Sequence, residues 1–169
     1  ELIKKKKKFK IPQIGVLIET PAAALISESL GKYCDFFAIG TNDLTMYTLA
    51  TDRGDEEVAN IYDPTHPSVL KLINLTTMSA HNNNIPVSIC GEMAGDTLFT
   101  QILVGLNITS LSMGISSILK IKQFLSNISF EEAKKISNEI LKDHDNVLIK
   151  KKLDNYRNYI SNKIKLGET

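Results

Sequence analysis

The sequence is poor in several residue types that point to particular functions. It contains no tryptophan, two cysteines, three histidines and, among its 20 basic residues, two arginines. Two cysteines make no disulfide framework, which favours a reducing, cytoplasmic compartment. The 20 basic and 19 acidic residues leave a net charge of +1, which excludes a strong field for nucleic acid or an anionic membrane. No apolar run approaches the roughly 18 residues of a membrane-spanning helix, so we expect neither nucleic acid nor membrane as a partner.

Length and composition limit the possible folds. Hydrophobic residues make up 43% of the chain and charged residues 23%, as in ordinary globular proteins. At 169 residues the chain is too short for a complete (β/α)8 barrel, which needs roughly 200 residues or more. Because the first residue is Glu1 and not Met, we expect the chain to be part of a longer protein.

Short apolar runs alternate with helical patterns along the chain. Continuous apolar runs of this length are typical of strands buried on both faces of a parallel sheet. Four alternating units predict an α/β fold with a parallel sheet, which is either half of an eight-unit barrel or a small open sheet. The predicted strands lie near residues 14–19, 34–40, 86–90 and 110–113.

Several residues predict where helices begin and end. Thr20 and Pro21 are a capping residue and a first-turn proline, and Gly31 is the expected end of the helix that follows. We expect residues 41–43 to form a turn before a helix over 44–50. C-terminal helices are predicted over residues 129–165, and the apolar face of the last one is expected to pack on its own domain.

The ends of the predicted strands carry polar side chains. Glu19 ends the first strand, Asn42 and Asp43 follow the second, and Cys90 ends the third. Ligands of parallel α/β folds lie at the carboxyl ends of the strands. Two carboxylates on one rim suit Mg²⁺ or Mn²⁺, which prefer oxygen ligands. The alternative for Asp43 is a helix cap or a pair with a lysine.

Cys90 and Arg53 each have a functional and a structural interpretation. A thiol at a strand end can be a nucleophile, a general acid or an inert buried group, and no second cysteine stands at a zinc-binding spacing. Cys34 begins its strand, at the opposite end from the expected site, and we assign it to packing. Arg53 suits a phosphate or carboxylate, or a surface salt bridge to a neighbouring acid.

Four segments together resemble one family. They are GVLIETPAAA (15–24), DFFAIGTNDLT (35–45), YTLATDR (47–53) and CGEMAGD (90–96). In this order and spacing they are similar to the C-terminal domain of enzyme I, the phosphoenolpyruvate–protein phosphotransferase of the bacterial sugar phosphotransferase system. The resemblance runs from about residue 11 to 143. Pyruvate phosphate dikinase and phosphoenolpyruvate synthase share the general motifs, but the segment from residue 45 to 54 is closer to enzyme I.

The resemblance implies a fold and a set of residue roles. The family fold is a (β/α)8 TIM-type barrel, and residues 1–169 would be its C-terminal half, the last four βα units, followed by C-terminal helices. Glu19 and Asp43 would hold Mg²⁺, with Mn²⁺ as a substitute. Asn42, Asp43 and Arg53 would bind phosphoenolpyruvate, and Cys90 would protonate the enolate to give pyruvate.

The resemblance also implies partners and leaves alternatives open. The phosphoryl acceptor would be a histidine on an N-terminal domain that these residues lack, and a small histidine phosphocarrier protein would follow it. A homodimer is expected, and this part alone is expected to be catalytically inactive. The alternatives are a fragment of a dikinase or synthase barrel, or an inert dimerisation or binding module.

Overall fold

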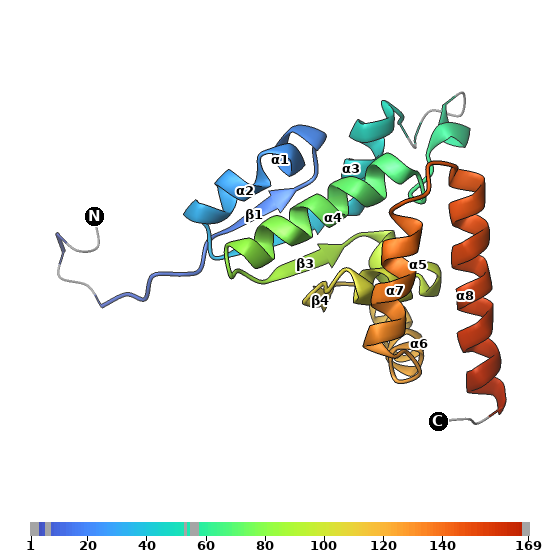
Figure 1. Ribbon diagram of the computed structural model, residues 1–169. Coiled ribbons are helices and arrows are strands. Elements are labelled where there is room, and N and C mark those ends of the chain that lie inside the picture. The colour runs from blue at the N-terminus through green and yellow to red at the C-terminus, as the bar shows by residue number, and fades with distance from the viewer. Residues whose placement is uncertain (1–3, 6–7, 53, 55–57, 167–169) are drawn as a thin grey trace.

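The computed structural model describes residues 4–5, 8–52, 54 and 58–166. They form an α/β fold around a four-stranded parallel sheet (Figure 1). The strands follow each other across the sheet in the order of the sequence. Each lies within a predicted segment: β1 (Gly15–Ile18), β2 (Phe36–Gly40), β3 (Val87–Cys90) and β4 (Ser110–Leu111).

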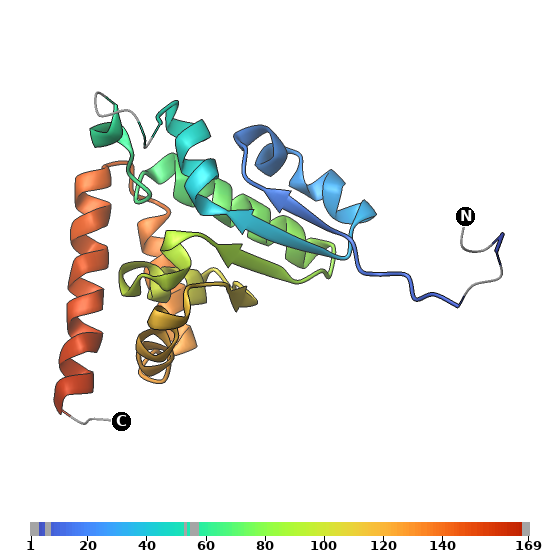
Figure 2. The same cartoon turned by 180° about the vertical axis from the view of Figure 1, so that it is seen from behind.

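Helices connect the strands and complete the C-terminal part. The connecting helices are α1 (Pro21–Leu25), α2 (Ser27–Leu30), the 3-10 turn η1 (Gly31–Tyr33), α3 (Thr41–Leu49), η2 (Ala59–Ile61), α4 (Pro67–Asn82), η3 (Glu92–Gly95) and α5 (Thr97–Gly105). After β4 come α6 (Ile115–Leu125), α7 (Phe130–Ile140) and α8 (Asn146–Leu166). Helix α4 lies in front of the sheet in Figure 1 and covers that face of it. Figure 2 shows the molecule from the other side, where the strands lie in front of α4.

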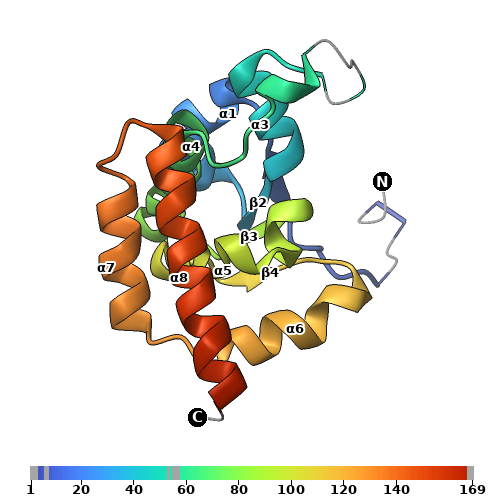
Figure 3. The ribbon, with the colours of Figure 1, turned by 90° about the vertical axis from the view of Figure 1, so that its right-hand side faces the viewer.

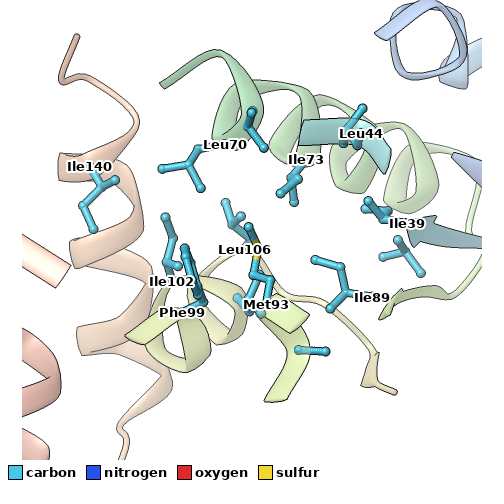
Figure 4. Close-up of a cluster of buried hydrophobic side chains, with 14 of the residues drawn as sticks. Ile39, Leu44, Leu70, Ile73, Ile89, Met93, Phe99, Ile102, Leu106 and Ile140 are labelled. Carbon is cyan, nitrogen blue, oxygen red and sulfur yellow. The ribbon is translucent and has the colours of Figure 1, made fainter. Parts of the chain in front are cut away.

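The two faces of the sheet differ in exposure. Ile18, Ile39 and Ile89 lie side by side in register, each fully buried, and they belong to the hydrophobic core that contains the buried residues of α4 and α5 (Figure 4). Burying one such side chain stabilises the fold by about 1.5–3 kcal/mol. On the opposite face Leu17 is 49% exposed and lies beside Ala38. One face therefore packs on helices, and among the residues that the structure describes the other face is open.

The C-terminal helices pack on α5. Helix α8 is buried through Ile149, Leu153 and Ile160, which confirms the predicted packing face. Helix α7 approaches α5 very closely at Gly105, where an added Cβ would lie 2.1 Å from the carbonyl oxygen of Ala133. No helix in the described ranges is long and apolar enough to cross a membrane.

One expected boundary is confirmed and another is wrong. Gly31 is the C-cap of α2, which ends at Leu30 as predicted, and its right-handed φ of −58° leads the chain into η1. The small size of Gly31 is also required by Asn83, whose Nδ2 would lie 2.6 Å from a Cβ at this position. Thr41 to Asp43 form the first turn of α3 and not a turn before it, because Gly40 is the N-cap. Glycine has no capping side chain, so the sequence does not indicate that the helix begins there.

Candidate functional site

The carboxyl ends of the first three strands bring the predicted side chains together. Glu19 follows β1 directly, Asn42 and Asp43 lie in the first turn of α3 directly after β2, and Cys90 is the last residue of β3. Gly40 pairs with Cys90 across the sheet. The carboxylate of Glu19 lies over Gly40, because a Cβ there would be 3.2 Å from Glu19 Oε2.

The Cys90 thiol lies in the field of both carboxylates. Its Sγ donates a hydrogen bond to the carbonyl oxygen of Ile39 (3.4 Å). Burial raises the pKa of the thiol, and the charges of Glu19 and Asp43 raise this pKa further. A thiol held in its neutral form can donate a proton but is a poor nucleophile. Of the three interpretations of Cys90, this environment disfavours the nucleophile and is compatible with both a general acid and an inert buried group.

The turn after Cys90 is held by the start of α3. Thr41 Oγ1 donates to the carbonyl oxygen of Cys90 (2.9 Å), and the backbone N–H of Glu92 donates to Asn42 Oδ1 (3.3 Å). Gly91 has a φ of +100°, which favours glycine, and a Cβ there would lie 2.6 Å from Thr41 Oγ1. Hydrogen bonds between side chains of α3 and backbone atoms of the turn after β3 therefore fix these two strand ends relative to each other beside the thiol.

A hollow of about 490 Å³ opens beside the thiol. Asn42, Cys90 and Glu92 line one side, and Ser112, directly after β4, and Ser117 of α6 line the other. These two serines and Thr41 are not among the site residues predicted from the sequence. Ser112 could have been predicted from the pairing of β3 with β4. Its backbone N–H donates to the carbonyl oxygen of Ile89, the residue before Cys90 (2.8 Å), which places Ser112 next to the thiol-bearing strand end.

The two carboxylates suit a hard divalent cation. Neither Glu19 nor Asp43 makes a side-chain hydrogen bond or an ion pair to another described residue. The helix-cap and lysine-pair alternatives for Asp43 are thus not seen in the described ranges. Within those same ranges no group of three or more His, Cys, Asp or Glu could hold a metal ion, but Mg²⁺ usually takes one or two carboxylates together with substrate oxygens and water.

The remaining predicted residues lie elsewhere. Arg53 falls outside the described residues. Cys34 precedes β2, at the opposite end from Cys90, and packs half-buried against the core. Its location agrees with the packing role that the sequence indicates.

Comparison with known proteins adds a family match. Residues 1–130 match the family described as PEP-utilising enzyme, PEP-binding domain. The chain is 42% identical over 146 residues to a phosphoenolpyruvate-protein phosphotransferase of Mycoplasma capricolum, covering 86% of this chain and 26% of that protein. The protein of the same name from Buchnera aphidicola is 44% identical over 147 residues, which cover 87% of this chain and 26% of that protein. The one from Bacillus subtilis is 42% identical over 129 residues, which cover 76% of this chain and 23% of that protein. The chain spans about a quarter of the length of these curated relatives.

Proposed function

The chain belongs to the family of PEP-utilising enzymes, whose PEP-binding domain matches residues 1–130, and on this basis we propose that it forms part of the phosphoenolpyruvate site of an enzyme I. In this role the parent protein moves a phosphoryl group from phosphoenolpyruvate to a histidine of an N-terminal domain, and from there to a small histidine phosphocarrier protein. Pyruvate is released, and the reaction is the first step of sugar uptake by the phosphotransferase system. The observation that carries the proposal is the convergence of Glu19, Asn42, Asp43 and Cys90 at three neighbouring strand ends.

We further propose that residues 1–169 are the second half of a (β/α)8 barrel domain. The parallel strands follow the order of the sequence without reversal, as they do in a barrel, whereas doubly wound sheets reverse their order and carry helices on both faces. The open face of the sheet, with Leu17 49% exposed, would be the barrel interior. The free edges of β1 and β4 would then pair with strands encoded upstream.

Each residue of the site has a role in this proposal. Asn42 and Arg53 bind the substrate, and Glu19 and Asp43 hold Mg²⁺, or Mn²⁺ in its place, with Asp43 also touching the substrate. When bound, the cation neutralises negative charge on the phosphoryl and enolate oxygens. The same two carboxylates are close enough to the Cys90 thiol to raise its pKa, which keeps the thiol neutral.

The chemistry at Cys90 follows from the transfer itself. The bond between phosphorus and the enol oxygen breaks, a bond to the acceptor histidine nitrogen forms, and the electron pair left on oxygen gives the enolate of pyruvate. The methylene carbon of the enolate then takes the proton of Cys90 Sγ. The product is pyruvate, and the thiolate that remains takes a proton from water. The raised pKa of Cys90 keeps the donor protonated at neutral pH.

A pair of matched variants in the full-length enzyme tests the role of the carboxylates. Glu19→Gln keeps the shape but removes the charge, and we expect phosphoenolpyruvate-dependent phosphorylation of the histidine to fall about 100-fold or more. Glu28→Gln makes the same charge change on the exposed surface of α2 and should leave the rate unchanged. Equal rates for the two variants would contradict the proposal.

Titration of the 169-residue chain with Mg²⁺ and phosphoenolpyruvate tests whether this part acts alone. We propose that it is catalytically inactive, because the upstream half of the barrel and the acceptor histidine are missing, and that the parent protein forms a homodimer.

Every relative described above is named a phosphotransferase, which favours this function over a dikinase or synthase. Phosphorylation of the full-length protein that requires a nucleotide would reverse that preference.

A further inference from the structure

Thr41, the first residue of α3, lies at the strand ends without facing the hollow beside Cys90. The residue is 1% exposed and is not among the residues that line the hollow. Its hydroxyl is used within the protein, because Oγ1 donates to the carbonyl oxygen of Cys90 (2.9 Å). Figure 3 views the chain from the side on which the strands end and shows α3 next to the segment that follows β3. Thr41 can therefore influence a reaction in the hollow through Cys90, and not by touching the substrate.

The end of β2 and the start of α3 hold Cys90 and the turn after it at three atoms. The carbonyl of Ile39 accepts from Cys90 Sγ (3.4 Å), and Thr41 Oγ1 donates to the Cys90 carbonyl oxygen. Asn42 Oδ1 accepts from the backbone N–H of Glu92 (3.3 Å). A thiol is a weak hydrogen-bond donor, whereas a hydroxyl at 2.9 Å from a carbonyl oxygen makes an ordinary hydrogen bond. The thiol can leave Ile39 when a substrate arrives, while the backbone that carries the thiol stays in place.

The position of the Thr41 hydroxyl is itself tightly determined. A Cβ at Gly91 would lie 2.6 Å from Thr41 Oγ1, so the hydroxyl is in close contact with the main chain directly after Cys90. On the other side, Thr45 Oγ1 donates to the carbonyl oxygen of Thr41 (2.7 Å) within α3. Valine has the same shape as threonine but no donor, so it would leave the Cys90 carbonyl facing a methyl group. A buried acceptor that loses its donor is unfavourable, and the Cys90 backbone would shift.

We propose that Thr41 is a positioning residue for the proton transfer from Cys90, an inference that rests on the proposed function. The hydroxyl fixes the main chain of Cys90 so that Sγ faces the methylene carbon when the enolate forms. The proton then leaves Sγ and a C–H bond forms at that carbon, while Thr41 keeps its own proton throughout. A general acid acts at close range, and a misplacement of about 1 Å lowers a rate about 100-fold.

Variants of Thr41 in the full-length enzyme test this role through the separate effects on kcat and KM. Thr41→Val should lower kcat for pyruvate formation about 10- to 100-fold. The KM for phosphoenolpyruvate should change by less than about twofold, because binding that is made outside the hollow is untouched. Thr41→Ser keeps the hydroxyl and should restore kcat to near the wild-type value. Thr41→Ala lacks both groups and should be as slow as the valine variant, which gives a second comparison should valine disturb the packing.

Thr77→Val is the matched control. Thr77 of α4 is also 1% exposed, and its Oγ1 donates to the backbone carbonyl of Ile73 at the same distance of 2.9 Å. This variant loses the same kind of buried hydrogen bond away from the strand ends, so its melting temperature should fall about as much as that of Thr41→Val while its turnover stays normal.

The possible results separate this inference from the proposed function. Equal turnover of the two valine variants, a raised KM of Thr41→Val without a change in kcat, or a serine variant as slow as the alanine variant would each overturn the role of Thr41. These outcomes leave the proposed function intact, because the wild-type enzyme still forms pyruvate. A wild-type enzyme that forms no pyruvate from phosphoenolpyruvate would contradict the proposed function, and the role of Thr41 with it.

Discussion

Gly105, the last residue of α5, is where the C-terminal helices meet the rest of the fold. A Cβ at this position would lie 2.1 Å from the carbonyl oxygen of Ala133, and ordinary contacts begin at 3.4 Å, so Gly105→Ala lacks 1.3 Å of space. The obstacle is backbone and cannot rotate away as a side chain can. Helix α7 must therefore move outward from α5 by about that distance.

The cost of this movement can be worked out from the contacts that hold α7. Overpacking of this kind costs about 1–3 kcal/mol, and the better helix propensity of alanine offsets at most about 1 kcal/mol. Partial loss of burial at Ile136 and Ile140, which are 8% and 0% exposed, adds to the cost. We expect a net loss of about 2 kcal/mol in the free energy of unfolding, or roughly 4–8 °C in melting temperature for a chain of this size.

Chemical and thermal denaturation followed by circular dichroism measure this effect. Gly114→Ala is the matched control, because an added Cβ there would have its nearest neighbour, Ser116 Oγ, at 3.9 Å and the φ of −61° suits alanine. Because Gly114 is the N-cap of α6, where alanine is less favourable than glycine, the stability of this variant should fall by no more than about 1 kcal/mol. If Gly105→Ala is as stable as this control, the close packing of α7 on α5 is wrong.

Two further predictions concern pKa values. Glu19→Gln removes a negative charge that raises the pKa of Cys90, so this pKa should fall and alkylation of Cys90 at neutral pH should become faster, with Cys34 in the same chain as an internal control. Burial and the nearby Glu139 raise the pKa of Tyr156, so Glu139→Gln should lower it, seen as earlier ionisation of one tyrosine at 295 nm in a chain that has no tryptophan. An unchanged alkylation rate or an unchanged titration curve would contradict the respective arrangement.

The part of the site that the sequence predicts is the part that strand ends determine. Glu19 and Cys90 stand directly at the ends of apolar runs, and parallel strands bring those ends to one edge. Thr41 was missed because its role depends on a hydrogen bond to the carbonyl of Cys90, 49 residues away. No local pattern encodes that contact, since it arises from strand pairing and from the positive φ of Gly91.

The helical part was predictable in its outline and not in its details. The apolar spacing of Ile149, Leu153 and Ile160 predicts the buried face of α8. The position of α7 on α5 was not predictable, because it depends on the close approach of Gly105 to Ala133, and these two residues belong to different helices. The C-cap at Gly31 was predictable, because glycine is common at helix ends, but the close contact of Gly31 with Asn83 was not.

The most direct test of the proposed function is pyruvate formation by the Cys90→Ala variant of the full-length enzyme. A general acid contributes about 10²–10⁴-fold to a rate, so turnover of phosphoenolpyruvate to pyruvate should fall within that range. Mg²⁺ binding should persist, because Glu19 and Asp43 are unchanged, and Cys34→Ala, which alters a cysteine at the opposite end of the sheet, should turn over normally. Unchanged turnover of Cys90→Ala would contradict the assignment of this thiol as the proton donor.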